Sequence, residues 1–235
     1  MDDSLAQYDE TTSTEAFTLQ NARLLKVSLR DVTIQAKLGA MVAYQGDVKF
    51  EHAGLGGMGR MLKKAVTGEG QSLMKISGSG EVFLAETAQE IHVITLENDK
   101  VTVNGANLLA FDAGIDWSIE RMQGVSGIMG GGLYNTALSG TGSVAILSDG
   151  PPVRLDVGSA PTFADPQAAI TWSSGVTTSV KTDVSMKNLI GRGSGESVQM
   201  AFGGQGWVLV QPSEGRPVPA APGGSQGGLG GLLKG

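Results

Sequence analysis

The sequence contains no cysteine, and only 17% of its 235 residues are charged and 5% aromatic. Without cysteine the chain can form no disulfide, no thiolate metal site and no cysteine nucleophile. Its formal net charge is −6, whereas non-specific binding of nucleic acid needs a surplus of lysine and arginine to neutralise phosphates. No stretch of about 18 apolar residues occurs, as a membrane-spanning helix would require. We therefore expect no nucleic-acid partner and no spanning helix.

Catalytic and ligand-binding motifs are also scarce. The two histidines, His52 and His92, stand alone, although a zinc site needs three or four ligands at suitable spacing. Residues 54–59 match G-x-G-x-x-G but follow no buried strand of a βαβ unit, and there is no P-loop motif. Asp112 and Asp116 could bind calcium or act as an acid–base pair, but with Gly114 between them they are more typical of a turn. We expect no catalytic, cofactor-binding or metal-binding residues and no enzymatic activity.

The two ends of the chain differ in composition from the middle. Residues 1–16 are acidic and rich in serine and threonine, and residues 212–235 are rich in proline and glycine. Neither segment can bury a hydrophobic core, so we expect a flexible N-terminus, a folded domain over residues 17–211 and a disordered tail. The first residues contain no basic stretch followed by an apolar one, as a secretory signal would. The expected location is the cytoplasm.

Short β-type runs, separated by Gly, Asn and Asp, dominate the middle of the chain. Val101 and Val103, for example, alternate with polar residues, as half-buried strands require. We expect Glu97–Lys100 to be the turn of a hairpin, and helices only at Met58–Val66 and, more weakly, Gly132–Leu138. This pattern predicts an all-β sandwich or barrel with one or two short helices. Further expected strands include Val32–Ala36, Ala40–Tyr44, Leu73–Ile76, Val82–Ala85, Leu108–Phe111, Val144–Leu147, Val153–Val157, Ile170–Trp172, Val198–Phe202 and Trp207–Val210.

A Gly-x-Gly element recurs in this pattern. The copies begin at Gly68 and Gly70, at Gly140 and Gly142, and at Gly193 and Gly195. Each copy is followed by an apolar run, further glycines and a second apolar run. Such glycines are typical of positions where the backbone has a positive φ or approaches another strand closely. We interpret the repeat as a two-strand hairpin unit in a duplicated module, with a third copy that does not fit a two-module scheme.

Two Gly-rich apolar segments, Gly54–Met61 and Gly124–Leu133, are candidates for subunit contacts. Exposed apolar patches of this kind mark partner sites, and open strand edges are often covered by association. The first segment leads into a short amphipathic stretch with basic residues, which could lie on an anionic membrane surface. Together these features favour a cyclic homo-oligomer. The candidate interaction residues are Leu55, Met58, Arg60, Met61, Lys63, Lys64, Ile128, Met129 and Leu133.

The order of several motifs resembles one known family. The motifs are GAMVAYQGDVKFE (39–51), GLGGMGRMLKKAVTGEG (54–70), GSGEVFLAE (78–86), VNGANLLAFD (103–112), GGGLYNTALSGTGSVAILSDG (130–150) and GWVLVQPSE (206–214). In this order they resemble bacterial members of the mitochondrial-biogenesis family called altered inheritance of mitochondria protein twenty-four, over about Phe17 to Glu214. The resemblance implies a duplicated β-sandwich similar to that of the tryptophan RNA-binding attenuation protein, and a trimeric assembly. It supplies no catalytic residues, and neither RNA binding nor the organelle role is carried over to this acidic chain, which has no Arg-rich presequence.

From these observations we expect a non-enzymatic, homo-oligomeric scaffold, with a trimer favoured, and with another protein or an anionic membrane surface as a further partner. Two alternatives remain open. One is a small-ligand-binding module that uses a groove between repeats or subunits. The other is an enzyme of unrecognised type, for which Asp112, Asp116 or His92 would have to converge in a deep pocket.

Overall fold

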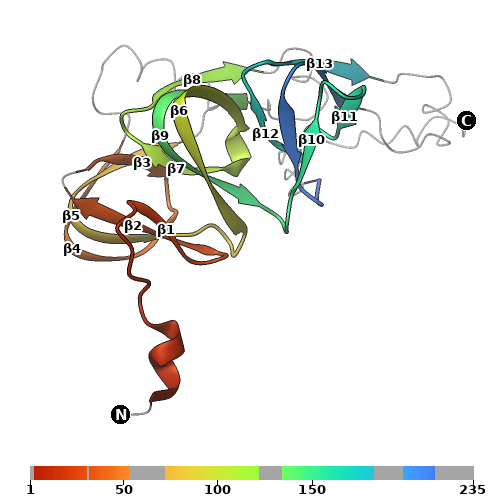
Figure 1. Cartoon of the computed structure of the whole chain (residues 1–235). Coiled ribbons are helices and arrows are strands. Elements are labelled where there is room, and N and C mark those ends of the chain that lie inside the picture. Colours follow the sequence, from red (N-terminus) through yellow and green to blue (C-terminus); the bar gives the residue numbers. More distant parts are fainter. Residues whose placement is uncertain (1–2, 31, 53–71, 122–133, 183–197, 215–235) are drawn as a thin grey trace, which may run out of the picture.

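Figure 1 shows the computed structural model, which describes residues 3–30, 32–52, 72–121, 134–182 and 198–214. These residues form β-strands and two short 3-10 helices, η1 (Asp3–Tyr8) and η2 (Gly105–Asn107), so the all-β prediction is confirmed. Within these ranges, no helix has the length and apolar character needed to cross a membrane. The strands are β1 (Phe17–Asn21), β2 (Leu24–Arg30), β3 (Ile34–Lys37), β4 (Met41–His52), β5 (Leu73–Leu84), β6 (Glu90–Asn104), β7 (Leu108–Asp112), β8 (Asp116–Arg121), β9 (Tyr134–Ser148), β10 (Val153–Asp156), β11 (Thr162–Ala164), β12 (Ala169–Ser173), β13 (Val176–Thr182), β14 (Val198–Gly204) and β15 (Trp207–Val210).

Several strands are longer than the sequence pattern predicts, because an expected turn is a bend within one strand. Glu97–Lys100 lies inside β6, where the ladder with β9 shifts register and Asn98 has φ +53°. The two runs on either side of Gly78 and Gly80 are the halves of β5. The expected helix at Gly132–Leu138 is wrong from residue 134 onward, where β9 begins. Met58–Val66 lies outside the described residues.

The strand pairings group β2 to β15 into three units of the same design. In each unit a bent third strand is paired on one side with a first strand and on the other with a second strand, all antiparallel. Unit 1 has β2 with β3 as its first strand, β4 as its second and β5 as its third. In unit 2 the first strand is β6, the second is β7 together with β8, and the third is β9. In unit 3 each of the three strands is divided into two consecutive segments. The first strand is β10 followed by β11, the second is β12 followed by β13, and the third is β14 followed by β15.

The register of the ladders shows that the three units are equivalent. An aromatic residue of the second strand lies opposite a valine of the third strand, two residues after the glycine pair of that strand. A register shift precedes the aromatic residue by one to three positions in every unit. The matched pairs are Tyr44 with Val82, Phe111 with Val144, and Trp172 with Val208. The described residues therefore form three units, where the sequence predicts a duplicated module.

The glycine pairs mark the bend of each third strand rather than the start of a hairpin. Gly140 and Gly142 have φ +129° and +149° within β9. The matching pairs are Gly78 and Gly80 in β5, and Gly204 and Gly206 between β14 and β15, all with positive φ. The expected repeat glycines Gly68, Gly70, Gly193 and Gly195 lie outside the described residues.

Close approach to a neighbouring strand also excludes a side chain at these bends. A Cβ atom on Gly78 would overlap the carbonyl oxygen of Asp47 in β4, and one on Gly206 would overlap the Ser173 side chain in β12. In unit 2 a Cβ on Gly142 would lie 2.8 Å from Oδ2 of Asp112. Each bend thus needs glycine twice, for its backbone angle and for the space beside it.

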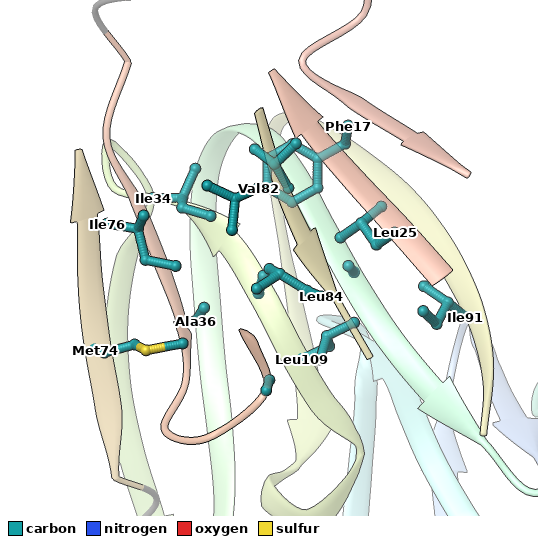
Figure 2. Close-up of a cluster of buried hydrophobic side chains, with 14 of the residues drawn as sticks. Phe17, Leu25, Ile34, Ala36, Met74, Ile76, Val82, Leu84, Ile91 and Leu109 are labelled. Carbon is teal, nitrogen blue, oxygen red and sulfur yellow. The ribbon is translucent and has the colours of Figure 1, made fainter. Parts of the chain in front are cut away.

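The bends fold both halves of each strand around a shared core, and each unit has its own hydrophobic cluster. In unit 1, Met74 and Ile76 precede the bend of β5 while Val82 and Leu84 follow it, and Figure 2 shows them in one buried cluster. The clusters of units 2 and 3 likewise contain residues from both halves of their third strands. A unit is therefore a small β-sandwich made of three bent strands.

Neighbouring units are joined in one continuous array through strand edges. The late half of the first strand in one unit pairs with the early half of the second strand in the next: β3 with β7, and β6 with β12. At each junction the later unit also contributes to the core of the earlier one. Leu109 of unit 2 lies in the cluster of unit 1, and Ile170 of unit 3 lies in that of unit 2.

The residues before β1 are attached to unit 1 by polar contacts. The Lys26 ammonium forms an ion pair with Glu10 at 3.0 Å and donates a hydrogen bond to the Thr11 carbonyl at 2.9 Å. The Gln20 amide donates to the carbonyl of Asp9 and accepts from the N–H of Thr11. Part of the N-terminal segment that the sequence analysis treats as flexible thus lies against β1 and β2.

Replacing a bend glycine should destabilise the fold. We expect Gly78→Ala, at φ +116° and against the Asp47 carbonyl, to lower the free energy of unfolding by about 2–3 kcal/mol. Gly114→Ala is the matched control, because its new methyl group meets no atom within 4 Å, and it should change stability by less than about 0.5 kcal/mol. Urea unfolding at fixed protein concentration measures both. Equal stability of the two variants would contradict the bend argument.

Candidate functional site

The two ends of the three-unit array present unlike open strand edges. In unit 1, β4 pairs with β5 alone, and in unit 3, β11 pairs with β14 alone, among the strands described. Figure 1 shows β4 at one end of the molecule and β11 at the other. The internal junctions pair a first strand of one unit with a second strand of the next. Strand β11 is part of a first strand, and β4 is a second strand, so the two open edges are of the kinds that pair internally. We refer to them as the β4 edge and the β11 edge.

The β4 edge exposes apolar side chains. Val42 is 57% exposed, Tyr44 50% and Phe50 37%. The rings of Tyr44 and Phe50 meet edge to face at 5.2 Å, so they form one patch. Between Met41 and Glu51, only Met41 and Val48 are half-buried, where they pack against the core of unit 1, and the other residues of this range are exposed.

The β11 edge is smaller but also apolar. It consists of Thr162, Phe163 and Ala164, and the Phe163 side chain is 43% exposed. The Lys181 ammonium of β13 lies 4.5 Å from the centre of the Phe163 ring, a cation–π distance. On β10, in the same unit, Val153 is 54% exposed. Unit 3 therefore leaves apolar surface open at the end of the array.

The exposure of the β4 edge follows from its position in the array. Tyr44 matches Phe111 of unit 2 and Trp172 of unit 3, which are both buried. Those two residues lie on strands that a preceding unit covers, whereas no described unit precedes β4. Phe111 and Trp172 lie in the clusters of their own units, whereas Leu109 and Ile170, the equivalents of Val42, lie in those of the preceding units, so Val42 is the part of the patch that the chain buries twice at internal junctions.

All nine residues that the sequence analysis selects for interaction lie outside the described residues, namely Leu55, Met58, Arg60, Met61, Lys63, Lys64, Ile128, Met129 and Leu133. The segments that contain them connect a second strand to a third strand, in units 1 and 2. The β4 edge is absent from that selection. Its sequence signal is the uncharged stretch Met41–Gln45 between a glycine and a second glycine at Gly46.

The candidate catalytic residues are used in bonds that hold strands together. Nε2 of His92 lies 2.8 Å from Oγ of Ser148, and that hydroxyl donates its proton to the Gly150 carbonyl, so Nε2 is the donor. Asp112 accepts a hydrogen bond from the N–H of Ser143 beside the bend of β9. Asp112 and Asp116 flank the turn between β7 and β8, as the turn interpretation predicts. The His52 side chain lies outside the described set.

Buried asparagine side chains beside the junction of units 2 and 3 bind backbone carbonyls. The Asn104 amide donates to the carbonyls of Pro166 and Ala169, and the Asn107 amide donates to the carbonyl of Leu147. All of these groups are engaged within the chain, so this junction gives no support to the ligand-binding alternative.

Two of three comparisons with known proteins found a match. The family model described as mitochondrial biogenesis AIM24 matches residues 17–213. A crystal structure of a protein from Streptococcus pyogenes superposes with a TM-score of 0.68 and 22% sequence identity, over 84% of this chain and 92% of that one. At this identity the likeness concerns the fold alone. No curated protein sequence matches the chain.

The environment of His92 predicts how stability changes with pH. Partial burial lowers the pKa of His92, and the Glu90 carboxylate partly opposes this shift. The unfolded chain then takes up a proton near pH 6.5, before the folded chain does, so this residue should cost stability as the pH falls from about 6.5 towards its lower folded pKa. Above pH 6.5 it is neutral in both states and has no such effect. Melting temperatures between about pH 8 and pH 5 should fall less for His92→Asn than for the native chain, and equal slopes would contradict this assignment.

Proposed function

The chain belongs to the mitochondrial biogenesis AIM24 family, and on that premise we propose that it is a non-enzymatic, homo-oligomeric scaffold protein. The observation that carries the proposal is the exposed apolar patch of Val42, Tyr44 and Phe50 on a strand with an open edge. An open, apolar edge strand is a template for pairing with another chain, and pairing with a defined partner strand satisfies its free backbone groups. Copies of the same chain supply a matching edge in β11.

The two unlike ends favour a cyclic assembly. When one surface of a chain binds a different surface of the next copy, the contact generates either a closed ring or an open filament. A ring leaves neither the β4 edge nor the β11 edge exposed, whereas a filament exposes one at each end. A trimer is the size that the family resemblance implies, and we adopt it for this proposal.

The non-enzymatic part of the proposal is supported by what the polar side chains already do. His92 and Asp112, two of the residues from which an active site could be built, hold neighbouring strand segments together. Both residues thus serve the packing of the strands, a role that a scaffold needs as well.

We place the scaffold in the cytoplasm, at an anionic membrane surface. The supporting feature is a sequence pattern: Arg60, Lys63 and Lys64 alternate with the apolar residues Met58, Met61 and Leu62 within a short stretch. Basic residues beside apolar ones bind anionic lipid headgroups, each basic side chain contributing about 1 kcal/mol near the surface. Three copies of the stretch in a trimer would act together.

The oligomer is tested by light scattering on the purified full-length chain. We expect a single discrete mass, a small multiple of 24.2 kDa, that persists at micromolar concentration. A monomer at that concentration would contradict the proposal, and a broad distribution of masses would favour filaments over a ring.

Vesicle flotation tests the membrane contact. The native chain should float with vesicles that contain anionic lipid at low salt, and the Arg60→Glu, Lys63→Glu, Lys64→Glu variant should float markedly less. Vesicles of neutral lipid serve as the control. If the native chain stays at the bottom of the gradient with anionic vesicles, the membrane contact is wrong while the scaffold proposal stands.

A further inference from the structure

We propose that copies of the chain join head to tail, with β11 of one copy pairing antiparallel with the early half of β4 in the next copy. In the same contact, Val42 of the next copy enters the core of unit 3. The inference rests on the proposed homo-oligomer and specifies its interface. It follows from the two junctions that already exist within the chain.

The internal junctions share one register, which can be read from the paired residues. The reference residue of each first strand is the one opposite the third-strand residue that lies two positions before the first bend glycine, namely Ile34 in unit 1 and Val101 in unit 2. At both junctions this residue pairs with the residue just after the aromatic position of the next unit's second strand. At the junction of units 1 and 2 the pairs are Ile34 with Asp112, Gln35 with Phe111, and Ala36 with Ala110. At the junction of units 2 and 3 they are Val101 with Ser173, Thr102 with Trp172, and Val103 with Thr171.

Applying this register to the open edges gives a specific interface. Thr162 occupies in unit 3 the place of Ile34 and Val101, because each lies opposite the third-strand residue two before the first bend glycine. Tyr44 occupies the aromatic position of unit 1. The resulting pairs between copies are Thr162 with Gln45, Phe163 with Tyr44, and Ala164 with Ala43. The two half-exposed aromatic residues thus meet as a cross-strand pair, an arrangement that stabilises antiparallel ladders.

The side chain two residues before the aromatic position supplies the apolar part of the contact. In units 2 and 3 this residue is Leu109 and Ile170, each 0% exposed and each in the cluster of the preceding unit. In unit 1 it is Val42, which is 57% exposed because no described unit precedes it. The residue at this position is therefore apolar in all three units and buried in units 2 and 3. In unit 1 it is exposed, because no described unit precedes unit 1 and offers a core for it.

Unit 3 exposes an apolar side chain at the matching end of the array. Val153 lies opposite Val210 and is 54% exposed. The equivalent residue of unit 1 is Leu25, opposite Leu84, which is fully buried in the cluster that also holds Leu109 from the following unit. In unit 2 the equivalent residue is the half-buried His92, opposite Ile146, so an apolar residue at this position is shared by the first and the last unit only.

Charge is distributed along β4 as this interface requires. The early half, Met41–Gln45, carries no charged residue, whereas Asp47, Lys49 and Glu51 occupy the late half. The β11 edge, Thr162–Ala164, is also uncharged. Edge strands that stay exposed are commonly protected by charged side chains, and here such protection is confined to the part of β4 outside the proposed pairing.

The first test is a charge at the inserted position. Val42→Asp should raise the dissociation constant of the oligomer at least about 100-fold, because the carboxylate would be buried in an apolar core. Val93→Asp is the matched control: it puts the same charge on an exposed valine of β6 in the middle unit, away from both ends, and should leave the mass by light scattering unchanged. Both substituted positions are exposed in the single chain, so both variants should fold.

The second test uses disulfides, which the cysteine-free sequence makes unambiguous. Two differently tagged chains are co-expressed, one with Tyr44→Cys and the other with Phe163→Cys. Paired positions of an antiparallel ladder have Cα atoms about 4.5–5.5 Å apart, within reach of a disulfide. Oxidation should link the two tags to each other. A Val93→Cys chain co-expressed with the Tyr44→Cys chain should give no link.

The outcomes separate this interface from the scaffold proposal. A monomeric native chain contradicts both. An oligomer that survives Val42→Asp, or in which Tyr44→Cys and Phe163→Cys do not link, contradicts the head-to-tail interface alone. A link between two Tyr44→Cys chains would show that β4 pairs with β4 across a two-fold axis, which overturns the inference as well.

Discussion

The fold depends on a bend in the third strand of each unit that only glycine permits. At Gly78 and Gly80, Gly140 and Gly142, and Gly204 and Gly206, the backbone takes a positive φ. In the tightest cases the neighbouring strand also occupies the place of a Cβ atom. The bend lets one strand contribute to two layers, so three strands suffice to enclose a core. A chain with few aromatic residues and many glycines can in this way build three small sandwiches in series.

The order of the units along the chain has a structural consequence. At each internal junction the earlier unit contributes a first strand and the later unit a second strand. Leu109 and Ile170 are buried in cores that belong to the preceding units, so the units are not independent domains. A series built in this way has two ends that differ, and each end lacks what the other offers. The apolar exposure at β4 and at β11 is therefore a property of the series rather than of either strand.

The sequence predicts the all-β class and the positions of most strands, because alternation of apolar and polar residues is a local signal. It does not distinguish a glycine that reverses the chain from one that bends it, because both need a positive φ. The runs around Gly78 and Gly80 therefore look like a hairpin, and Asn98 looks like part of a turn. Only the long-range pairing of β5 with β4, and of β6 with β9, shows that the chain continues forward. Strand β2 was detectable from the alternation of Leu25, Val27 and Leu29. The exposure of Val42 was not, because it depends on the absence of a preceding unit.

The two internal junctions have the same register, and this bears on whether head-to-tail association forms a closed ring. The rotation from one unit to the next is set by which residues pair and by where the strands bend. When the same pairs recur, the operation that relates one unit to the next recurs as well, and a junction between copies that repeats the internal register applies it again. The series closes into a ring when this operation has no rise along its axis and its rotation divides a full turn, and it otherwise generates a helical filament. In the ring both the β4 edge and the β11 edge of every copy are paired, whereas a filament leaves one of each unpaired at its ends.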